Sequence, residues 1–585
     1  MDKRIWFYNS TLTFKTMRKK EKTDILKAIP LGGHGEIGKN CWVFECNDEM
    51  IIVNFGMMLP SHDLTGVDLV FPSTAYLQDN KEKIKGLILT SAHDDSCGGV
   101  FYLLNKINIP KIWGSKLAIE TVKQNLPKNI TLPETEDIIP RKEFQIGNSF
   151  NIRAISNTSS LPDTYGLFIK SLTGNILYTG SYKIDQTPPD GVLFDYFYFS
   201  QSGEDGTDLL ISDSTNVETK GYSPSERSIT KKFDEIFKDS TSRIIIFSYA
   251  SNLHKFQILF NLAKKNNKKI LLCGNYLTNK IKAAVNTGFL KFDKTILIDE
   301  KDTKEIQGKD TIVIITGKYG DFLSALIEVA KEEHPLIKLQ SQDTVIVSAT
   351  PPPGTARILA HTIDQLFVQK VQVIGGRGQN VHASTHAAQE EAKFIITVSK
   401  PRSFVPSHGE ERQMVIYGNL TESMGINPND IHILKNGDVL ELREQVARVA
   451  NKVPAQSIFY NCAKGLDIDE TTMKERLALS EEGTITVALT VNLERNIIAG
   501  PEILAEACSF AKGKDWRAFC LGTIELIKDA IKQSVDRKET ELMNLKSTIR
   551  DVVNKSVLEL IGKRPLISVS IQEVNITVNL TSSKK

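Results

Sequence analysis

One loop constrains the fold of this chain more than any other segment. Residues 84–89 (Ile-Lys-Gly-Leu-Ile-Leu) form an apolar run typical of a buried strand, and residues 90–99 continue as Thr-Ser-Ala-His-Asp-Asp-Ser-Cys-Gly-Gly. Polar loops that directly follow buried strands are where hydrolytic folds collect catalytic groups. His93 and Asp95 are therefore candidate site residues, although a lone histidine or aspartate on a loop is structural in most proteins.

Other polar loops support this interpretation. Three of them follow predicted strands, at residues 179–186, 211–216 and 405–410. Strand ends of this kind converge at one edge of a layered sheet, so we expect a shared site there. A further segment, His-Ala-Ser-Thr-His at 382–386, precedes a helix-like run. Its two histidines, four residues apart, could lie near one face, and the first turn of the helix would offer N–H groups to a phosphate.

Composition narrows the possible classes. A length of 585 residues allows roughly three to five domains. The net charge of +2 means that nucleic-acid binding would need a local basic patch. The seven cysteines are scattered and never spaced as C-x-x-C, which favours free thiols in a reducing cytoplasmic setting. No stretch approaches the roughly 18 apolar residues that span a bilayer, so no membrane partner is expected.

The pattern of apolar and polar residues changes along the chain. Residues 24–223 contain short β-branched or apolar runs broken by Gly, Asn, Asp and Pro, typical of a strand-rich α/β layer fold. Residues 224–375 alternate helical stretches with continuous strands, which predicts a second α/β module around a parallel sheet. Residues 1–23 are too polar for a signal peptide and predict a disordered leader, with Met17 as an alternative start.

A small module is predicted near the C-terminus. It combines a strand at 484–491, one long helical region near 523–561 and an edge-like strand at 566–574. Alone, this is too little chain to bury a large core.

Residues 33–38 (Gly-His-Gly-Glu-Ile-Gly) match the G-x-G-x-x-G fingerprint of dinucleotide sites. That fingerprint requires a helix to follow, whereas residues 39–45 read as a strand. We therefore predict a tight turn between two strands, for which glycine is suited.

Taken together, the motifs resemble a known family. The loop at 90–99 resembles the T-H-x-H-x-D-H-x-G-G metal loop of the metallo-β-lactamase fold, and the order of the blocks resembles the ribonuclease J family from about Ile29 to Val574. The other blocks are Leu31–Asn40, Gly66–Pro72, Leu161–Asp163, Asp185–Pro188, Ser212–Asn216, Ser223–Ser228, Ala250–His254, Ser348–Gly354, His382–His386, Val405–Glu410 and Arg564–Val574.

The resemblance implies an α/β architecture: a metallo-β-lactamase αββα sandwich with an inserted β-CASP α/β domain and a small C-terminal α+β domain. The expected boundaries are 24–223 and 376–447 for the two parts of the sandwich, 224–375 for β-CASP, 448–482 for a linker and 483–578 for the C-terminal oligomerisation domain. It also implies an activity, the maturation and decay of RNA by a 5′-to-3′ exo- and endoribonuclease that uses two zinc ions.

In active members of the family, seven side chains hold these metals, and the resemblance carries over only three of them, His93, Asp95 and His408. The other four positions hold serine: Ser91, Ser96, Ser159 and Ser181. Ser181 stands where the bridging aspartate would be, and Gln413 replaces a further frequent histidine. A serine hydroxyl is a weak donor to Zn²⁺, so tight binding of two zinc ions is not expected.

The resemblance also implies a substrate-binding loop, which reads H-V-S-G-H in the family. This chain has His382, Ala383, Ser384, Thr385 and His386 there and so keeps both histidines and the serine. Thr385 adds a Cβ where the family has glycine and a phosphate approaches the backbone. RNA binding is expected to persist in weakened form.

Three functions remain open at this point. The leading hypothesis is an RNA-binding or scaffolding subunit with a degenerate hydrolytic centre. It would associate with itself or with an active paralogue through residues 484–578. The alternative is a working nuclease that holds one metal through Asp95 and His408, with Asp95 as base and His386 supporting the phosphate or leaving group. A metal-independent hydrolase that uses one of the new serines would have only His93 as its base.

Overall fold

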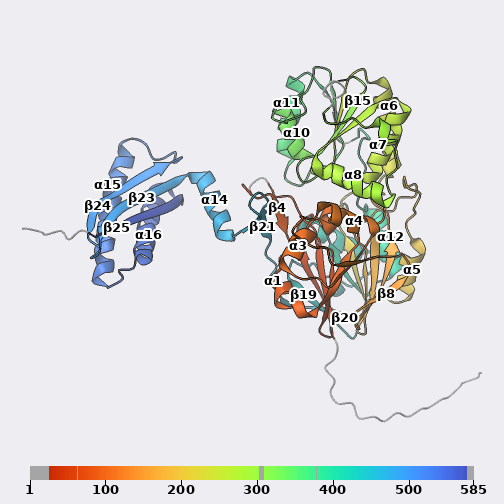
Figure 1. Cartoon of the computed structure of the whole chain (residues 1–585). Helices are drawn as coiled ribbons and strands as arrows, with labels where there is room; N and C mark the ends of the chain where they lie inside the picture. The colour runs from red at the N-terminus through yellow and green to blue at the C-terminus, as the bar shows by residue number, and fades with distance from the viewer. Residues whose placement is uncertain (1–24, 62–63, 302–307, 377, 576–585) are drawn as a thin grey trace, which may run out of the picture. The chain divides into compact units, whose positions relative to one another are not determined.

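The computed structural model describes residues 25–61, 64–301, 308–376 and 378–575 (Figure 1). The predicted leader at 1–23 lies outside these ranges. The chain divides into two compact units. The first comprises residues 1–59 and 70–457, and the second comprises residues 60–69 and 458–585.

The first unit contains two mixed β-sheets that pack on each other. The larger has the order β20–β19–β1–β2–β3–β5–β6–β7, and the smaller has the order β18–β12–β11–β10–β9–β8. The larger sheet consists of β1 (Leu26–Gly32), β2 (Cys41–Cys46), β3 (Glu49–Val53), β5 (Ile84–Leu89), β6 (Lys111–Gly114), β7 (Glu134–Asp137), β19 (Asp438–Arg443) and β20 (Val446–Lys452). The smaller consists of β8 (Glu143–Ile146), β9 (Phe150–Ser156), β10 (Tyr165–Lys170), β11 (Asn175–Tyr178), β12 (Leu209–Asp213) and β18 (Ser403–Ser407).

Alternation along the strands builds two apolar layers. On β10, Leu167 and Ile169 pack with Trp42 and Phe44 in the core shared by the two sheets. Phe168 belongs to a second core beneath helices α5 (Tyr196–Glu204), α12 (Gln389–Ser399) and α13 (Glu411–Ser423). Successive strand residues point to opposite faces, so a strand that is buried along its whole length serves both layers. Helices α3 (Val100–Lys106) and α4 (Lys116–Asn125) connect the parallel strands β5, β6 and β7.

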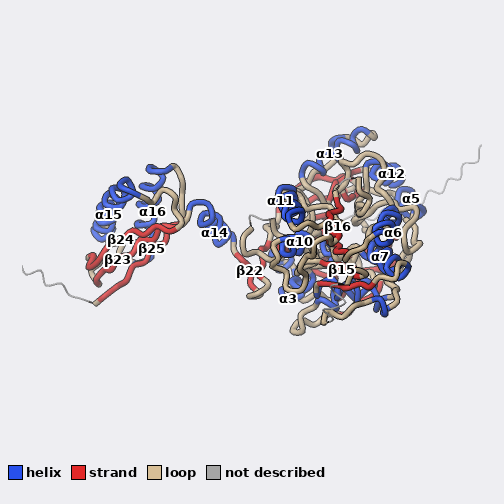
Figure 2. Tube along the Cα trace, turned by 90° about the horizontal axis from the view of Figure 1, so that it is seen from above, coloured by secondary structure: helices blue, strands red, loops and turns tan. Residues whose placement is uncertain are grey.

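A third sheet, in which all strands are parallel, belongs to the same unit. Its order is β14 (Lys269–Cys273), β15 (Thr311–Ile315), β13 (Ile244–Phe247), β16 (Thr344–Val347) and β17 (Gln372–Gly375). Figure 2 shows α10 (Leu323–Ala330) and α11 (Ala356–Val368) on one face, with α6 (Thr230–Asp239) and α7 (Leu253–Lys265) on the other. Helix α8 (Asn275–Thr287) contacts α4, where the amide of Asn286 donates to Glu120 at 2.8 Å.

The second unit contains a three-stranded sheet, β24 (Ile497–Glu506), β23 (Thr484–Asn492) and β25 (Leu566–Val574). Helices α15 (Gly513–Asp536) and α16 (Leu542–Ile561) bury an apolar stripe, including Ile527 and Val553, against alternate residues of β23. It also holds the hairpin β21 (Ile458–Asn461) and β22 (Leu466–Ile468), and helix α14 (Glu470–Glu482).

The glycine-rich segment connects strands β1 and β2, as predicted, with positive φ at Gly33, Gly35 and Gly38. The connection spans residues 33–40 and is therefore longer than the predicted tight turn. The seven cysteines are present as thiols. The predicted helical region near 523–561 is present but consists of two helices, because the chain breaks between α15 and α16 at residues 537–541. Within the described ranges, no helix combines the length and apolar character that a bilayer crossing requires.

Candidate functional site

The predicted convergence of strand-end loops is present in the structure. Strands β11, β12 and β18 are parallel neighbours, and Asp213 at the end of β12 lies in register with Ser407, one residue before His408. Parallel neighbours end at the same edge of a sheet, so the residues after them are brought together. The loop after β5, which carries His93 and Asp95, contributes to the same place: Asp95 Oδ2 lies 3.3 Å from His408 Nε2.

Asp95 joins two of the predicted residues. Its Oδ1 lies 3.0 Å from His93 Nδ1 and accepts a hydrogen bond from the Ser96 hydroxyl at 2.7 Å. Burial by itself raises the pKa of Asp95, but attraction to His93 and His408 outweighs burial and holds this pKa well below its ordinary value. For His93, burial lowers the pKa, and the nearby Asp95 more than reverses that shift.

Asp213 joins the other two histidines. Its Oδ2 lies 2.6 Å from His386 Nδ1, and its Oδ1 lies 3.6 Å from His408 Nδ1. Burial raises the pKa of Asp213, but attraction to His386 outweighs it, so the net shift is strongly downward. The side chains therefore form a continuous row, His93–Asp95–His408–Asp213–His386, in which each buried carboxylate lies between two imidazoles.

Sequence reasoning did not assign a role to Asp213. The signal was present, because Asp213 comes two residues after the apolar run Leu-Leu-Ile at 209–211. An acidic residue at the carboxyl end of a buried strand stands where sites form in open α/β sheets.

Each of the four serines is held by a hydrogen bond within the protein. The Ser91 hydroxyl accepts from the His93 backbone N–H at 3.1 Å, and the Ser96 hydroxyl donates to Asp95. The Ser159 hydroxyl bonds within its own loop, to the backbone of Leu161. Ser181 Oγ lies 3.3 Å from His408 Nδ1. Three of the four serines therefore lie against the row of histidines and carboxylates.

The parallel-sheet module contributes side chains to the loop after β5. Ser251 Oγ lies 3.2 Å from His93 Nε2, Tyr276 donates to Asp94 at 2.5 Å, and Lys280 pairs with Asp94 at 2.7 Å. Ser251 thus supplies the hydroxyl at hydrogen-bond distance from His93 Nε2, a role that the sequence did not indicate. Ser251 is only 3% exposed, so its hydroxyl fixes the imidazole and is not presented to a substrate.

The prediction for the segment 382–386 is right about its position and wrong about the free N–H groups. Both histidines lie in a loop before a helix, as predicted, because α12 begins at Gln389. The first N–H groups around that helix start, however, already have acceptors: Ala388 donates to Glu391, Gln389 to Thr219, and Glu390 to Gly221. A phosphate therefore finds no free helix terminus here.

The five predicted substrate-binding residues of this loop differ in their contacts and in their burial. His382 Nδ1 lies 3.4 Å from Lys255 Nζ, and burial lowers the pKa of Lys255 to about 7. Ala383 is buried, and the carbonyl of Ser384 accepts from Lys183 at 2.9 Å. Thr385 is half-buried. His386 is the member that reaches the row, through Asp213.

The backbone around His408 is held in an uncommon conformation. His408 has φ of 52°, a left-handed value that is rare outside glycine. The Thr215 hydroxyl donates to its carbonyl at 2.6 Å, and the Gln413 amide donates to the Thr215 carbonyl at 2.7 Å. Gln413 thus secures the loop that presents His408.

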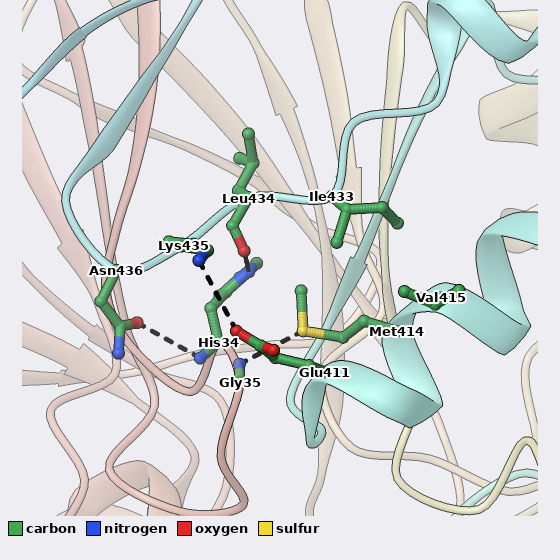
Figure 3. A pocket seen from close by; sticks show the side chains of 9 residues that line it. All are labelled: His34, Gly35, Glu411, Met414, Val415, Ile433, Leu434, Lys435 and Asn436. Carbon is green, nitrogen blue, oxygen red and sulfur yellow. Dashed lines mark hydrogen bonds and ion pairs between the residues drawn. The ribbon is translucent and has the colours of Figure 1, made fainter.

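A pocket of about 450 Å³ lies beside this loop, where His34 and Gly35 face α13 (Figure 3). The His34 backbone N–H donates to Asn436 at 3.2 Å, and its ring Nδ1 lies 3.3 Å from the Leu434 carbonyl. Burial lowers the pKa of His34 to about 3, so its imidazole is neutral near pH 7. None of the predicted site residues lines this pocket.

Parts of this chain match known protein domains. Residues 241–366 match the ribonuclease J β-CASP domain, residues 370–433 the zinc-dependent metallo-hydrolase RNA specificity domain, and residues 471–574 the ribonuclease J C-terminal domain. Ribonuclease J of Synechocystis sp. is 37% identical over 83% of this chain and 76% of its own length. Ribonuclease J2 of Bacillus subtilis is 31% identical over 95% of this chain and 100% of its own length.

The chain belongs to the ribonuclease J family. The predicted family and fold class are thereby confirmed. A crystal structure of a protein of unknown function from Enterococcus faecalis is similar in fold to 72% of this ribonuclease J-family chain, with a TM-score of 0.50 at 15% identity. The family is one of RNA-processing proteins, and the name of the domain matched by residues 370–433 associates it with a metal cofactor.

Proposed function

We propose that this chain is a ribonuclease J-type RNA-binding or scaffolding subunit whose hydrolytic centre is degenerate. The proposal rests mainly on the four positions at which the family resemblance implies metal ligands. They hold serines, and each hydroxyl is already engaged in a hydrogen bond inside the protein. Neutral hydroxyls are weak donors to Zn²⁺.

A two-zinc centre does not fit this donor set. Of the seven donors that the family resemblance implies, His93, Asp95 and His408 remain, and the position of the bridging carboxylate holds Ser181. Without a carboxylate shared by two cations, their mutual repulsion is not offset, and the clamp that two metals form on a phosphodiester is lost. No catalytic step is therefore assigned to a pair of zinc ions.

Retention of the scaffold supports the RNA-binding half of the proposal. Residues 370–433 match a domain named for RNA specificity, and the loop at 382–386 is anchored by Lys183, Ser223 and Asn216. Seven cysteine thiols suit a reducing compartment, which we take to be the cytoplasm.

The test measures binding and cleavage on the same preparation. Purified protein should shift 5′-monophosphorylated RNA in a gel while cleaving it, with Mn²⁺ or Zn²⁺ added, far more slowly than a seven-ligand ribonuclease J assayed in parallel. Cleavage at a comparable rate would refute the degenerate centre, and failure to bind RNA would refute the scaffold role.

A second candidate is a nuclease with a reduced metal site. It is favoured by the 3.3 Å approach of Asp95 to His408, with His386 linked to the same imidazole through Asp213. In this candidate Asp95 and His408 hold one metal ion, Asp95 acts as base, and His386 supports the phosphate or leaving group. Loss of a stoichiometric metal and of cleavage in Asp95→Ala would support it.

A further inference from the structure

The donors that gather most tightly are not those that the family resemblance assigns. Asp213, His386 and His408 each offer one ligand atom, and these atoms lie within 4.8 Å of one another. Only His408 belongs to the expected set of metal ligands. The three residues come from separate segments, the end of β12, the loop before α12 and the end of β18.

We propose that Asp213, His386 and His408 hold a single divalent transition-metal ion at a site displaced from the family's two-zinc centre. Two imidazole nitrogens with one carboxylate oxygen form a common ligand set for Zn²⁺ and related ions. The proposal is independent of RNA binding and competes with the Asp95–His408 site of the reduced nuclease.

The spacing around His408 Nδ1 suits a cation. Three oxygens surround this nitrogen: Ser181 Oγ at 3.3 Å, Thr215 Oγ1 at 3.4 Å and Asp213 Oδ1 at 3.6 Å. Ligand atoms that are each bound at about 2.1 Å to a tetrahedral ion lie roughly 3.4 Å apart. The contact between Asp213 and His386 would have to lengthen from 2.6 Å to about 3.4 Å to admit the ion.

The surrounding residues fix one ligand and add a second carboxylate near the site. Asp95 Oδ2 lies 3.3 Å from the opposite ring nitrogen of His408, Nε2, without hydrogen-bond geometry, so Asp95 places a negative charge beside this imidazole but does not fix its tautomer. Asp213 is itself held by the backbone N–H and the hydroxyl of Thr215, at 3.0 and 2.7 Å. The two carboxylates, Asp95 and Asp213, also carry the two negative charges that a dication balances.

The site would give this family member one cation where active relatives use two. His386, bound through Nδ1, would then be a ligand and would no longer be available to support a leaving group. The ion would tie the loop before α12 to the ends of β12 and β18, and would thus stabilise the loop at 382–386.

The experiment uses the full-length protein, stripped of metal by a chelator and titrated with Zn²⁺ by calorimetry and with Co²⁺ by visible absorption. One ion per chain is expected, with Co²⁺ bands that indicate nitrogen and oxygen donors. Asp213→Asn and His386→Gln should each weaken binding by more than about 100-fold, beyond the 10–100-fold typical of residues that only orient a ligand. Two variants are used because Asp213 is buried and its replacement could disturb folding, whereas His386 is partly exposed.

His93→Gln is the matched control, because His93 contacts Asp95 but none of the three proposed ligands. It should change the affinity by less than about 10-fold, at the weak end of such indirect effects. Metal retained at full affinity in His386→Gln, or lost in His93→Gln, would overturn the proposal in favour of a site around Asp95. Absence of stoichiometric Zn²⁺ and Co²⁺ binding by the unaltered protein would overturn it outright.

Discussion

At the scale of single residues, the site is an electrostatic arrangement that needs all of its members. Two buried carboxylates alternate with three imidazoles, and each carboxylate has its pKa held low by these neighbours. An isolated buried charge is costly, so removing one member leaves its partner uncompensated. This dependence explains why the row can stand as a structural unit beside the four serines that occupy the metal-ligand positions implied by the family resemblance.

Placing the ligands implied by the family resemblance at the four serine positions should produce a two-zinc site. The combined variant Ser91→His, Ser96→His, Ser159→His and Ser181→Asp replaces four neutral hydroxyls with donors that Zn²⁺ prefers. We expect it to bind two Zn²⁺ per chain, measured by elemental analysis after gel filtration. The same four positions changed to alanine serve as the control, and two-zinc binding by that control would contradict the prediction.

His34 predicts an acid-dependent loss of stability. Because burial lowers its pKa from 6.5 to about 3, the unfolded chain takes up a proton between pH 6.5 and 3 that the folded chain does not. Stability therefore rises with pH across this window and falls as the pH is lowered. His34→Gln removes the titrating group, so the decrease in melting temperature from pH 7 to pH 5 should be smaller than in the unaltered protein.

His361, an exposed histidine on α11, provides the control for this measurement. His361→Gln should follow the pH dependence of the unaltered protein. Equal pH dependence in His34→Gln and the unaltered chain would contradict the assignment of acid sensitivity to His34.

At the scale of elements, one buried carboxylate fastens the segments around the site. Glu391 on α12 is fully buried, and its two oxygens accept from the backbone N–H groups of Ile184, Ser223 and Ala388 at 2.7–2.8 Å. It thereby joins the loop after β11, the chain leading into the parallel-sheet module and the start of its own helix.

Glu391→Gln should destabilise the fold, because an amide cannot accept at both of its ends. The free energy of unfolding is expected to fall by about 1–3 kcal/mol for each N–H left unpaired. Urea denaturation followed by circular dichroism measures this change. Glu390→Gln, next in sequence but on the exposed side of the helix, should change stability by less than about 0.5 kcal/mol and is the matched control.

Strand positions could be predicted from sequence to a large extent, because continuous apolar runs such as 84–89 and 209–213 are fully or mostly buried strands. The predicted edge strand 566–574 coincides with β25. The break between α15 and α16 was missed because residues 537–541 carry neither proline nor glycine. The domain boundaries remain predictions.

The site was only partly predictable, because some of its contacts join segments that are far apart in the sequence. Strand-end loops pointed to His93, Asp95 and His408, but contacts such as Ser251 with His93 depend on how one module packs on another. Such tertiary contacts leave no local periodicity in a sequence. The engaged N–H groups at the start of α12 are a second case, because their acceptors Thr219 and Gly221 lie far away in the chain.

At the scale of the whole molecule, we predict association through the C-terminal module. Helices α15 and α16 cover one face of its sheet, whereas on the opposite face Leu504 is 48% exposed and its cross-strand neighbour Thr486 is half-buried. We propose that this module pairs with a second copy or with an active ribonuclease J, which would allow a subunit with a degenerate centre to contribute surface to an assembly.

Removing residues 484–585 should give a smaller species by light scattering, with the mass of a truncated monomer. Leu504→Asp in the full-length chain is the more conservative test, because it places a charge on the open face without altering the covered one. A full-length chain that is already monomeric, alone and when mixed with an active ribonuclease J, would contradict the prediction.

The order of strands in the eight-stranded sheet also governs how the protein emerges from the ribosome. β1 lies between β2, its neighbour in sequence, and β19, which pairs with it at Ala28 and Leu440. At a synthesis rate of 5–20 residues per second, β1 waits roughly 20–80 s for β19 to appear. During that interval one of its edges offers unsatisfied backbone groups to any other nascent chain. Translation speed and chaperone supply, and not only native stability, therefore help to set the yield of this protein in a cell.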